Sequence, residues 1–399
     1  MTNQLILVTG AAGYVGSHCL IELLNNGYKV VAIDNCMNAI ETEDVTHHTI
    51  MPESLRRVQT ITGHQLVKYY KVDINDRKQL DTIFNEHRFE AVIHFASLKA
   101  VGESCQIPLE YYRNNVSGAV TLFETMKKYA VKRLIFSSSA TVYGYPDYLP
   151  IDEKHHTGRN CTNPYGRTKF FIEEILKDLC NSEKDWNVVS LRYFNPVGAH
   201  DSGEIGEDPQ GIPNNLMPYI AQVAVGRQPF LKVFGNDFNT NDGTGVRDYI
   251  HIMDLASGHV VTLDKMLSES DSGWEVYNLG AGTGYSVLDV ISAFEKSTGV
   301  QIPYKIFDRR SGDVDELWAD IGKATNQLNW KPKRSLKEMC AHSWNWQSKN
   351  PMGYRTNNRT EMKSKPVTQT NQQITIKGKS IQQQQQEVNN NDMDMVAYE

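Results

Sequence analysis

The chain has 399 residues, enough for a large hydrophobic core and for two domains. Its net charge of −6 and hydrophobic content of 40% indicate a globular protein and give no reason to expect nucleic acid or a membrane surface as partner. The N-terminus lacks the basic start of a signal peptide, and no apolar run approaches the roughly 20 residues of a membrane span. The six widely spaced cysteines predict reduced thiols, so we expect a cytoplasmic protein.

The first 35 residues predict a dinucleotide-binding unit. A short apolar run at 5–9 leads into a glycine-rich turn, then a helical pattern ending near Gly27 and a second strand at 29–33. Glycines here let the backbone approach a pyrophosphate, which the N-terminus of the helix attracts. Asp34 closes the second strand, where its carboxylate can bind ribose hydroxyls and would repel a 2′-phosphate, which favours NAD over NADP. The residues of this unit expected at the cofactor are Gly10, Ala12, Gly13, Tyr14, Val15, Gly16, Asp34 and Asn35.

Strands and helices continue to alternate up to about residue 136. We expect strands at 66–72, 91–96 and 133–136, and helices around 80–84 and 116–126. Successive β-α units form a parallel sheet covered on both faces, and ligands bind at the carboxyl ends of its strands. The fold class is therefore α/β, a doubly wound sheet of the Rossmann type. Asp73 and Ile74 are expected beside the adenine, whereas the polar insertion at 41–59 has no role that we can read.

A hydroxyl-rich stretch and a capped helix carry the candidate catalytic groups. The serines at 137–139 are expected to leave the sheet edge as a polar loop. Asn163 suits a helix cap and Pro164 the first helical position, so Tyr165 should lie in the first turn with Lys169 on the same face. The helix dipole and the lysine ammonium should lower the pKa of the phenol, so that it can take a proton from a substrate hydroxyl. With a loop serine, the pair predicts a hydride-transfer site beside a nicotinamide.

The sequence resembles the extended short-chain dehydrogenase/reductases and, within them, the UDP-glucose 4-epimerase family. The similarity covers about residues 4–350 and is carried by the segments 9–18, 95–104, 137–144, 163–169, 191–196, 211–216 and 243–251. It implies that NAD stays bound while Tyr165 takes the proton of the sugar 4-hydroxyl. It also implies that Ser139 holds O4 and that Lys169 binds the nicotinamide ribose. The 4-keto sugar would then turn over and receive the hydride on its other face, which inverts C4.

The resemblance also implies further contacts to cofactor and substrate. Around NAD it places Phe95, Lys99, Asn115 and Tyr193. Around the UDP-sugar it places Lys99, Ser139, Tyr165, Asn195, Asn214, Asn215, Leu216, Val233, Phe234, Arg247, Arg310, Asp313 and Leu317. Arginine suits a diphosphate because its planar fork matches phosphate oxygens. Leu317 falls where family members differ in bulk, tyrosine being associated with refusal of N-acetylated sugars, so we hypothesise partial acceptance of UDP-N-acetylglucosamine.

Three other functions compete with epimerisation, and the sequence argues against the first. A nucleotide-sugar 4,6-dehydratase shares the fold, but that family has Asp-Glu directly after the hydroxyl residue, where this chain has Ala140 and Thr141. An ordinary dehydrogenase would exchange NADH with solvent, and a non-catalytic NAD-binding scaffold would use the Gln/Asn-rich tail to bind partners. The histidine pairs at 47–48 and 155–156 lack the spacing of a metal-binding helix, so we expect solvated loops and no metal.

The sequence predicts three parts. Residues 1–190 are expected to form the NAD-binding domain, and 191–350 mainly a smaller UDP-sugar-binding subdomain with crossing segments. Residues 351–399 contain glutamine and asparagine runs, cannot bury enough apolar surface to offset their ordering entropy, and are expected to be disordered. The family resemblance implies a homodimer, with the helices around 116–129 and 170–179 as candidate surfaces.

Overall fold

The computed structural model describes residues 4–44, 49–269, 272–310 and 312–355, and a parallel sheet forms its centre. Within these residues the strands of that sheet are β1 (Leu5–Thr9), β2 (Lys29–Asp34), β5 (Lys68–Lys71), β6 (Ala91–His94), β7 (Arg133–Ser139), β8 (Asn187–Tyr193) and β12 (Gly273–Leu279). They lie in the order β12-β8-β7-β6-β1-β2-β5, and every neighbouring pair is parallel. The predicted Rossmann-type fold is confirmed.

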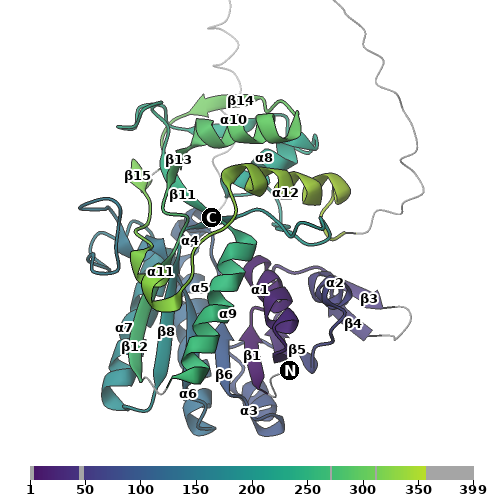
Figure 1. The fold of residues 1–399 in the computed structure, drawn as a ribbon, viewed down its shortest axis with the longest axis vertical. Coiled ribbons are helices and arrows are strands. Elements are labelled where there is room, and N and C mark those ends of the chain that lie inside the picture. The colour runs from purple at the N-terminus through teal and green to yellow at the C-terminus, as the bar shows by residue number, and fades with distance from the viewer. Residues whose placement is uncertain (1–3, 45–48, 270–271, 311, 356–399) are drawn as a thin grey trace, which may run out of the picture. The chain divides into compact units, whose positions relative to one another are not determined.

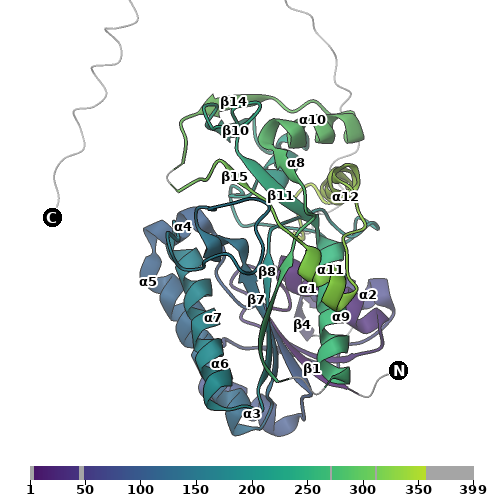
Figure 2. The same cartoon turned by 60° about the vertical axis from the view of Figure 1, so that its left-hand side comes forward.

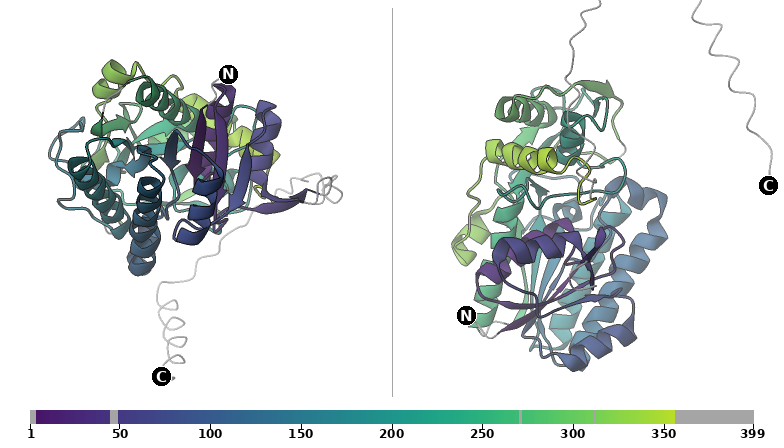
Figure 3. Two further views of the ribbon diagram at one scale, coloured as in Figure 1. Left: turned by 90° about the horizontal axis from the view of Figure 1, so that it is seen from below. Right: turned by 90° about the vertical axis from the view of Figure 1, so that its right-hand side faces the viewer.

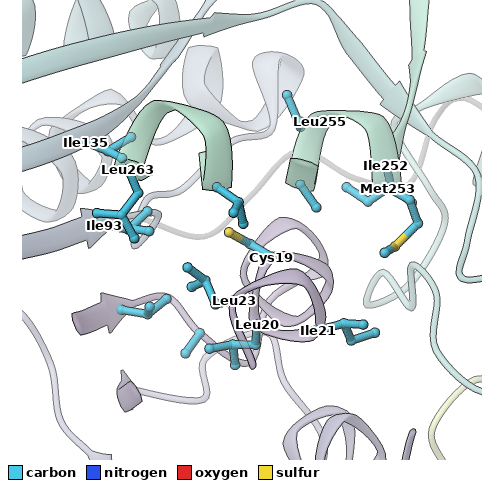
Figure 4. Packing of buried hydrophobic residues seen from close by; sticks show 14 of the residues in the cluster. Cys19, Leu20, Ile21, Leu23, Ile93, Ile135, Ile252, Met253, Leu255 and Leu263 are labelled. Atoms are coloured by element: carbon cyan, nitrogen blue, oxygen red, sulfur yellow. The ribbon is translucent and has the colours of Figure 1, made fainter. Parts of the chain in front are cut away.

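Helices cover both faces of the sheet, as Figures 1 and 2 show. One face carries α3 (Arg77–Glu86), α6 (Gly118–Lys128) and α7 (Pro164–Ser182), and the other carries α1 (Tyr14–Asn25) and α9 (Ile252–Ser268). Because side chains alternate along a strand, Leu7 of β1 packs on the first face and Ile6 and Val8 pack on the second. Figure 4 shows the second face, where apolar side chains of α1, among them Cys19 and Leu23, meet those of α9.

A smaller group of elements from the second half of the chain lies at one end of the sheet (Figure 1). Its members are β9 (Asn195–Val197), α8 (Leu216–Ala224), β10 (Leu231–Phe234), β11 (Val246–His251), β13 (Gly284–Ser286), α10 (Val287–Thr298), β14 (Tyr304–Phe307), β15 (Glu316–Leu317) and α12 (Leu336–Lys349). Strand β11 pairs with β9, β13 and β15, and β10 pairs with β14. Ile220, Phe294 and Met339 lie in a separate core between α8, α10 and α12.

Short elements complete the connections around the sheet. Between β6 and α6 the chain forms α4 (Val101–Gln106), α5 (Pro108–Tyr111) and a π-helical turn at Tyr112–Ser117. A 3₁₀ turn at Ala140–Tyr143 follows β7, and α11 (Gly322–Leu328) packs on β12. In the part of the chain that the structure describes, no helix combines the length and apolarity that a membrane span requires.

The polar insertion at 41–59 has a defined fold. It forms an antiparallel hairpin, β3 (Glu41–Asp44) and β4 (Thr49–Pro52), followed by α2 (Glu53–Thr62). Figure 3 shows the hairpin projecting away from the sheet. Leu55 and Val58 of α2 are buried against α1, and Arg57 donates to the Glu204 carbonyl and to Asn350 Oδ1, each at 2.8 Å. Arg57 therefore links the insertion to the second half of the chain by hydrogen bonds.

Several local expectations need correction. The serines at 137–139 do not form a loop but continue β7, because they pair with residues 191–193 of β8. The helix expected at 116–126 begins with the π-helical turn. His155 was expected in a solvated loop but is buried, and its Nε2 accepts a hydrogen bond of 2.9 Å from the Asp147 amide. Among the described residues, no group of three or more His, Cys, Asp or Glu side chains is arranged to hold a metal ion.

The expected division of the chain at residue 190 stays a prediction. The structure adds that β12 and α9, from beyond this point, belong to the central parallel sheet and its covering layer. At the other end, Tyr354 is buried with its ring 4.7 Å from that of Trp346, so the fold continues beyond residue 351. The rest of the expected tail, with its glutamine and asparagine runs, and the histidines at 47–48 lie outside the described residues.

Candidate active site

The turn between β1 and α1 is shaped by two glycines that the packing requires. Gly10 has a φ of +66°, and a Cβ there would lie 2.5 Å from the Ala96 amide nitrogen. A Cβ at Gly16 would lie 2.3 Å from the Gly10 carbonyl oxygen. Gly13 precedes α1 without a side chain to cap it, and the first turn of α1 carries no acidic group. The turn thus presents the positive end of a helix to an anion, as a bound pyrophosphate requires.

The end of β2 places one carboxylate next to this turn, and a second follows β5. Asp34 accepts hydrogen bonds from the amides of Ala12 at 3.0 Å and Cys36 at 2.8 Å. Burial raises the pKa of Asp34, and these two bonds oppose the shift. Asn35 donates to Asp73 at 2.9 Å, which joins the two strand ends. Ile74 beside it is buried in the core.

Two further predicted cofactor neighbours lie along the same edge. Asn115 is buried and clamps Leu98, accepting from its amide at 2.8 Å and donating to its carbonyl at 3.0 Å. The Lys99 ammonium lies 5.6 Å from the centre of the Tyr14 ring in the first turn of α1, and it pairs with Glu207 at 2.8 Å. Asn115 therefore positions the chain that carries Lys99, and Lys99 lies where a phosphate at α1 would meet it.

Tyr193 and Phe95 meet a buried histidine that the sequence reading missed. His259 Nδ1 contacts the Leu255 carbonyl at 2.8 Å, so this nitrogen donates and Nε2 accepts the 2.5 Å bond from the Tyr193 hydroxyl. Burial lowers the pKa of His259 to about 4, so it is neutral near pH 7. The Phe95 ring is centred 5.0 Å from the same imidazole. The sequence feature that could have indicated this contact is a histidine within the apolar stripe of α9.

The three predicted catalytic residues come together at the N-terminus of α7. Asn163 caps this helix by accepting a 2.8 Å hydrogen bond from the Gly166 amide, as expected. Tyr165 lies in the first turn and is hydrogen-bonded to Ser139 at the end of β7. The Lys169 ammonium lies 5.8 Å from the centre of the Tyr165 ring and donates to the Ser137 carbonyl at 2.7 Å. A base, a hydroxyl donor and a cation thus share one site.

The ionisation of this pair differs from the expectation. Burial raises the pKa of Tyr165 to about 12, although the bond with Ser139 acts to lower it. Burial also lowers the pKa of Lys169 to about 7, against the effect of Glu173. The predicted lowering of the phenol pKa by the chain's own groups is therefore wrong. The reason is that desolvation disfavours both charged forms, and the lysine donates to a carbonyl oxygen.

The predicted diphosphate and uridine residues converge on Asp313. Arg310 donates to it through Nε at 2.9 Å, and Arg247 Nη2 lies 4.0 Å from it. The Arg310 guanidinium also lies 5.1 Å from the centre of the Phe234 ring. Leu317 pairs in register with Arg247 across β15 and β11. Two arginines, one of them beside an aromatic ring, suit a nucleoside diphosphate.

Other expected substrate residues are placed less uniformly. Asn195 begins β9 and is exposed. Asn214 is also exposed, Asn215 precedes α8, and Leu216 is its first residue, at the positive end of that helix. Val233 is buried in the core, so its side chain is not available to a ligand, whereas its neighbour Phe234 is partly exposed.

An ion pair beneath the catalytic residues escaped the sequence reading. Glu173 of α7 and Arg192 of β8 are both buried and joined by two hydrogen bonds of 3.0 and 2.6 Å. Two features of the sequence could have indicated this ion pair. Glu173 repeats the four-residue spacing from Tyr165 to Lys169, and Arg192 is a charge within an apolar strand, where it requires a partner.

Comparisons with known proteins agree with this arrangement. The family model described as GDP-mannose 4,6 dehydratase matches residues 7–343. The UDP-glucose 4-epimerase of Drosophila melanogaster is 58% identical over 354 residues, 89% of this chain and 99% of that protein. That of Homo sapiens is 56% identical over 351 residues, 88% and 98% of the two chains. The crystal structure of UDP-glucose 4-epimerase from Bifidobacterium longum in complex with NAD+ and UDP has a TM-score of 0.82 and 50% identity, covering 88% of this chain and all of that one. The chain therefore belongs to the UDP-glucose 4-epimerase family.

Proposed function

We propose that the protein interconverts UDP-galactose and UDP-glucose by inverting C4 through a 4-keto intermediate, with NAD as a tightly bound cofactor. The observation that carries the proposal is the grouping of Ser139, Tyr165 and Lys169 at the same sheet edge as the glycine turn, in a chain of the 4-epimerase family. This set provides both a proton acceptor and a donor for the oxygen at C4.

The chain's residues fit a dinucleotide. Gly10 and Gly16 let the turn pack tightly against neighbouring backbone in front of α1, whose N-terminus suits a pyrophosphate, and Asp34 is held by backbone amides at the end of β2, where a ribose would lie. NAD, when bound here, supplies a nicotinamide ring that takes up a hydride from C4 and gives it back. Lys99 and the α1 N-terminus would hold the phosphates, and Asp34 with Asn35 the adenosine ribose.

The catalytic residues act on the oxygen at C4. Ser139 holds O4 by a hydrogen bond, and Tyr165 as phenolate takes the hydroxyl proton and later returns it. Lys169, when protonated, stabilises the phenolate across the site, and burial strengthens this attraction. Arg247 and Arg310 hold the diphosphate, so the nucleotide stays fixed while the sugar turns over.

Two side chains support epimerisation over dehydration. Elimination of water requires an acid and a base beside C6 and C5, at the positions that Ala140 and Thr141 occupy. Ala140 is buried among apolar side chains, and the Thr141 hydroxyl donates to Ser139 at 3.0 Å. Neither provides a carboxyl group, so the keto sugar is reduced again.

The test is to give purified protein UDP-galactose without added NAD and to measure UDP-glucose. We expect conversion toward equilibrium with no accumulation of NADH. Conversion that requires added NAD and releases NADH would indicate an ordinary dehydrogenase. No conversion by protein that retains NAD would indicate a scaffold. Either result contradicts the proposal.

Three further properties follow from the family and from local features. Leu317 shares an apolar cluster with Ala140, next to Ser139, so we propose that its size sets acceptance of N-acetylated UDP-sugars. We propose a homodimer, because Leu109 of α5 and Phe171 of α7 expose apolar surface. We also propose a cytoplasmic location, which the six free cysteines support.

A further inference from the structure

Three consecutive serines of β7 contact α7 in three different ways. The Ser137 carbonyl accepts from Lys169 at 2.7 Å, and Ser139 is bonded to Tyr165. Between them, the Ser138 hydroxyl donates to Glu173 Oε1 at 2.5 Å. The strand thus holds three side chains of α7 that lie four residues apart along one helix face. The proposed reaction uses the first two and leaves Glu173 unexplained.

Glu173 is part of a buried polar network. Arg192 binds it through Nε at 3.0 Å and Nη2 at 2.6 Å, and Arg192 Nη1 donates to the Tyr143 hydroxyl at 3.0 Å. That hydroxyl in turn donates to Asn278 of β12 at 2.6 Å. All of these side chains, with Ser138, are almost fully buried. A buried ion pair adds little stability over apolar residues of similar size, so its presence calls for a role other than stability.

The groups around Lys169 show what that role is. On α7 the lysine faces Tyr165 and Glu173, and the Ser137 carbonyl faces it from β7. From β6 it faces His94, whose pKa is lowered to about 3 by burial and by Lys169, so this imidazole is neutral. Glu173 is the carboxylate that acts on Lys169, and it raises the pKa of the ammonium against the opposing effect of burial.

We propose that Glu173, held in place by Arg192 and Ser138, is a positioning residue that keeps Lys169 protonated beside Tyr165. The inference rests on the proposed function, since it concerns the base of that reaction. When the tyrosine–lysine pair has lost one proton, the remaining proton lies on the phenol or on the amine. Only the phenolate–ammonium form has a base ready for the sugar hydroxyl. A fixed negative charge near the amine favours that form.

The experiment measures the protonation of Lys169 directly. The full-length protein as purified, with lysines carrying 13C at Cε, is titrated by NMR, and the Lys169 signal is assigned by its loss in Lys169→Met. In Glu173→Gln we expect the midpoint of the Lys169 titration to move to lower pH by about one unit, which corresponds to a tenfold weaker proton affinity of the lysine amine. The control is Glu174→Gln, which removes the next carboxylate of α7, paired at the surface with Lys177, and should leave the midpoint unchanged.

The turnover profile is a second readout. In Glu173→Gln the rise of turnover on the acid side of its pH profile should move to lower pH. The maximum turnover should fall at least tenfold, because a smaller fraction of the singly deprotonated Tyr165–Lys169 pair is phenolate. If Glu173→Gln does not fold, Glu173→Gln/Arg192→Met removes both buried charges and is expected to shift the Lys169 midpoint the same way. A midpoint equal to that of the unsubstituted protein, in either variant, would overturn the inference. The NMR midpoint needs no turnover, so failure of the proposed epimerase activity remains a separate result.

Discussion

Burial shifts the pKa values of Tyr165 and Lys169 in opposite directions, so that both charged forms are disfavoured, and this is the main residue-scale difference from what the sequence predicts. The spacing, the cap and the helix start could be predicted, because each depends on a few neighbouring residues. The pKa values could not, because they depend on what lies around the pair. The serine carbonyl that takes the lysine's hydrogen bond approaches it only in the fold, and how far Glu173, one turn along α7, offsets the burial of the lysine charge depends on that burial.

Tyr165→Phe tests the base at this scale. It removes one hydroxyl and leaves the ring, so we expect native circular dichroism and unchanged NAD content. General base catalysis contributes about a hundred- to ten-thousand-fold, and the turnover of UDP-galactose should fall by that amount. The exposed Tyr145 provides the control, because Tyr145→Phe should keep full turnover. Turnover by Tyr165→Phe within a few-fold of the unsubstituted protein would reject the role.

Leu317→Tyr tests the proposed determinant of substrate range. Leu317 lies in the apolar cluster that includes Ala140 and Phe194, beside the catalytic serine. A tyrosine there would fill space that an N-acetyl group needs. We expect kcat/KM for UDP-N-acetylglucosamine to fall at least tenfold relative to that for UDP-galactose, about 1.4 kcal/mol of discrimination. An unchanged ratio of the two values would contradict the assignment.

At the scale of elements, the β1–α1 turn was the most predictable part of the fold. Its strand, glycines, helix and terminal Asp34 are consecutive in sequence, so the local pattern suffices. The serines at 137–139 show the limit. They read as a polar loop because the side chains are hydrophilic, but their backbone pairs with β8, some 50 residues later along the chain. A strand end fixed by a distant partner has no local signal.

Gly16→Ala is predicted to disrupt the cofactor site, whereas Gly13→Ala is a milder change. The added Cβ at Gly16 would lie 2.3 Å from a backbone oxygen of Gly10, which cannot move without distorting the turn. At Gly13 the same oxygen is 3.3 Å away, and a shift of a few tenths of an ångström relieves the contact. We expect purified Gly16→Ala protein to contain little NAD and Gly13→Ala protein to retain most of it, measured by absorbance after denaturation. Equal NAD content in both variants would show that the close approach is not what shapes the site.

At the scale of the whole molecule, the second half of the chain completes the first. Strand β12 extends the NAD-binding sheet, and α9 covers the face on which α1 packs. The sequence predicted that some segments of the second half would join the first domain, but it did not identify them. The reason is that the residues of an apolar strand do not show which sheet the strand pairs with. The α2 insertion was unreadable for a similar reason. Arg57 donates hydrogen bonds to Glu204 and Asn350, which are far from it in sequence and lie beside it only in the fold.

Association of two copies is the last property that the described surface allows us to test. Of the two helices expected at a dimer surface, α6 buries Leu122 and Phe123, whereas α7 leaves Phe171 42% exposed, near the 75% exposed Leu109 of α5. Phe171→Asp would place a charge where a partner excludes water, which costs more than the 1.4 kcal/mol that weakens association about tenfold.

We expect light scattering to give a dimer mass for the unsubstituted protein and a monomer mass for Phe171→Asp at micromolar concentration. Ile306→Asp alters a similarly exposed apolar residue, 49% exposed on β14, and should remain dimeric. A dimer that survives Phe171→Asp would move the interface to another surface. Monomers of both variants would instead point to general destabilisation, because Phe171 and Ile306 lie on separate elements, α7 and β14. The contrast between the two variants, rather than either mass alone, therefore locates the interface.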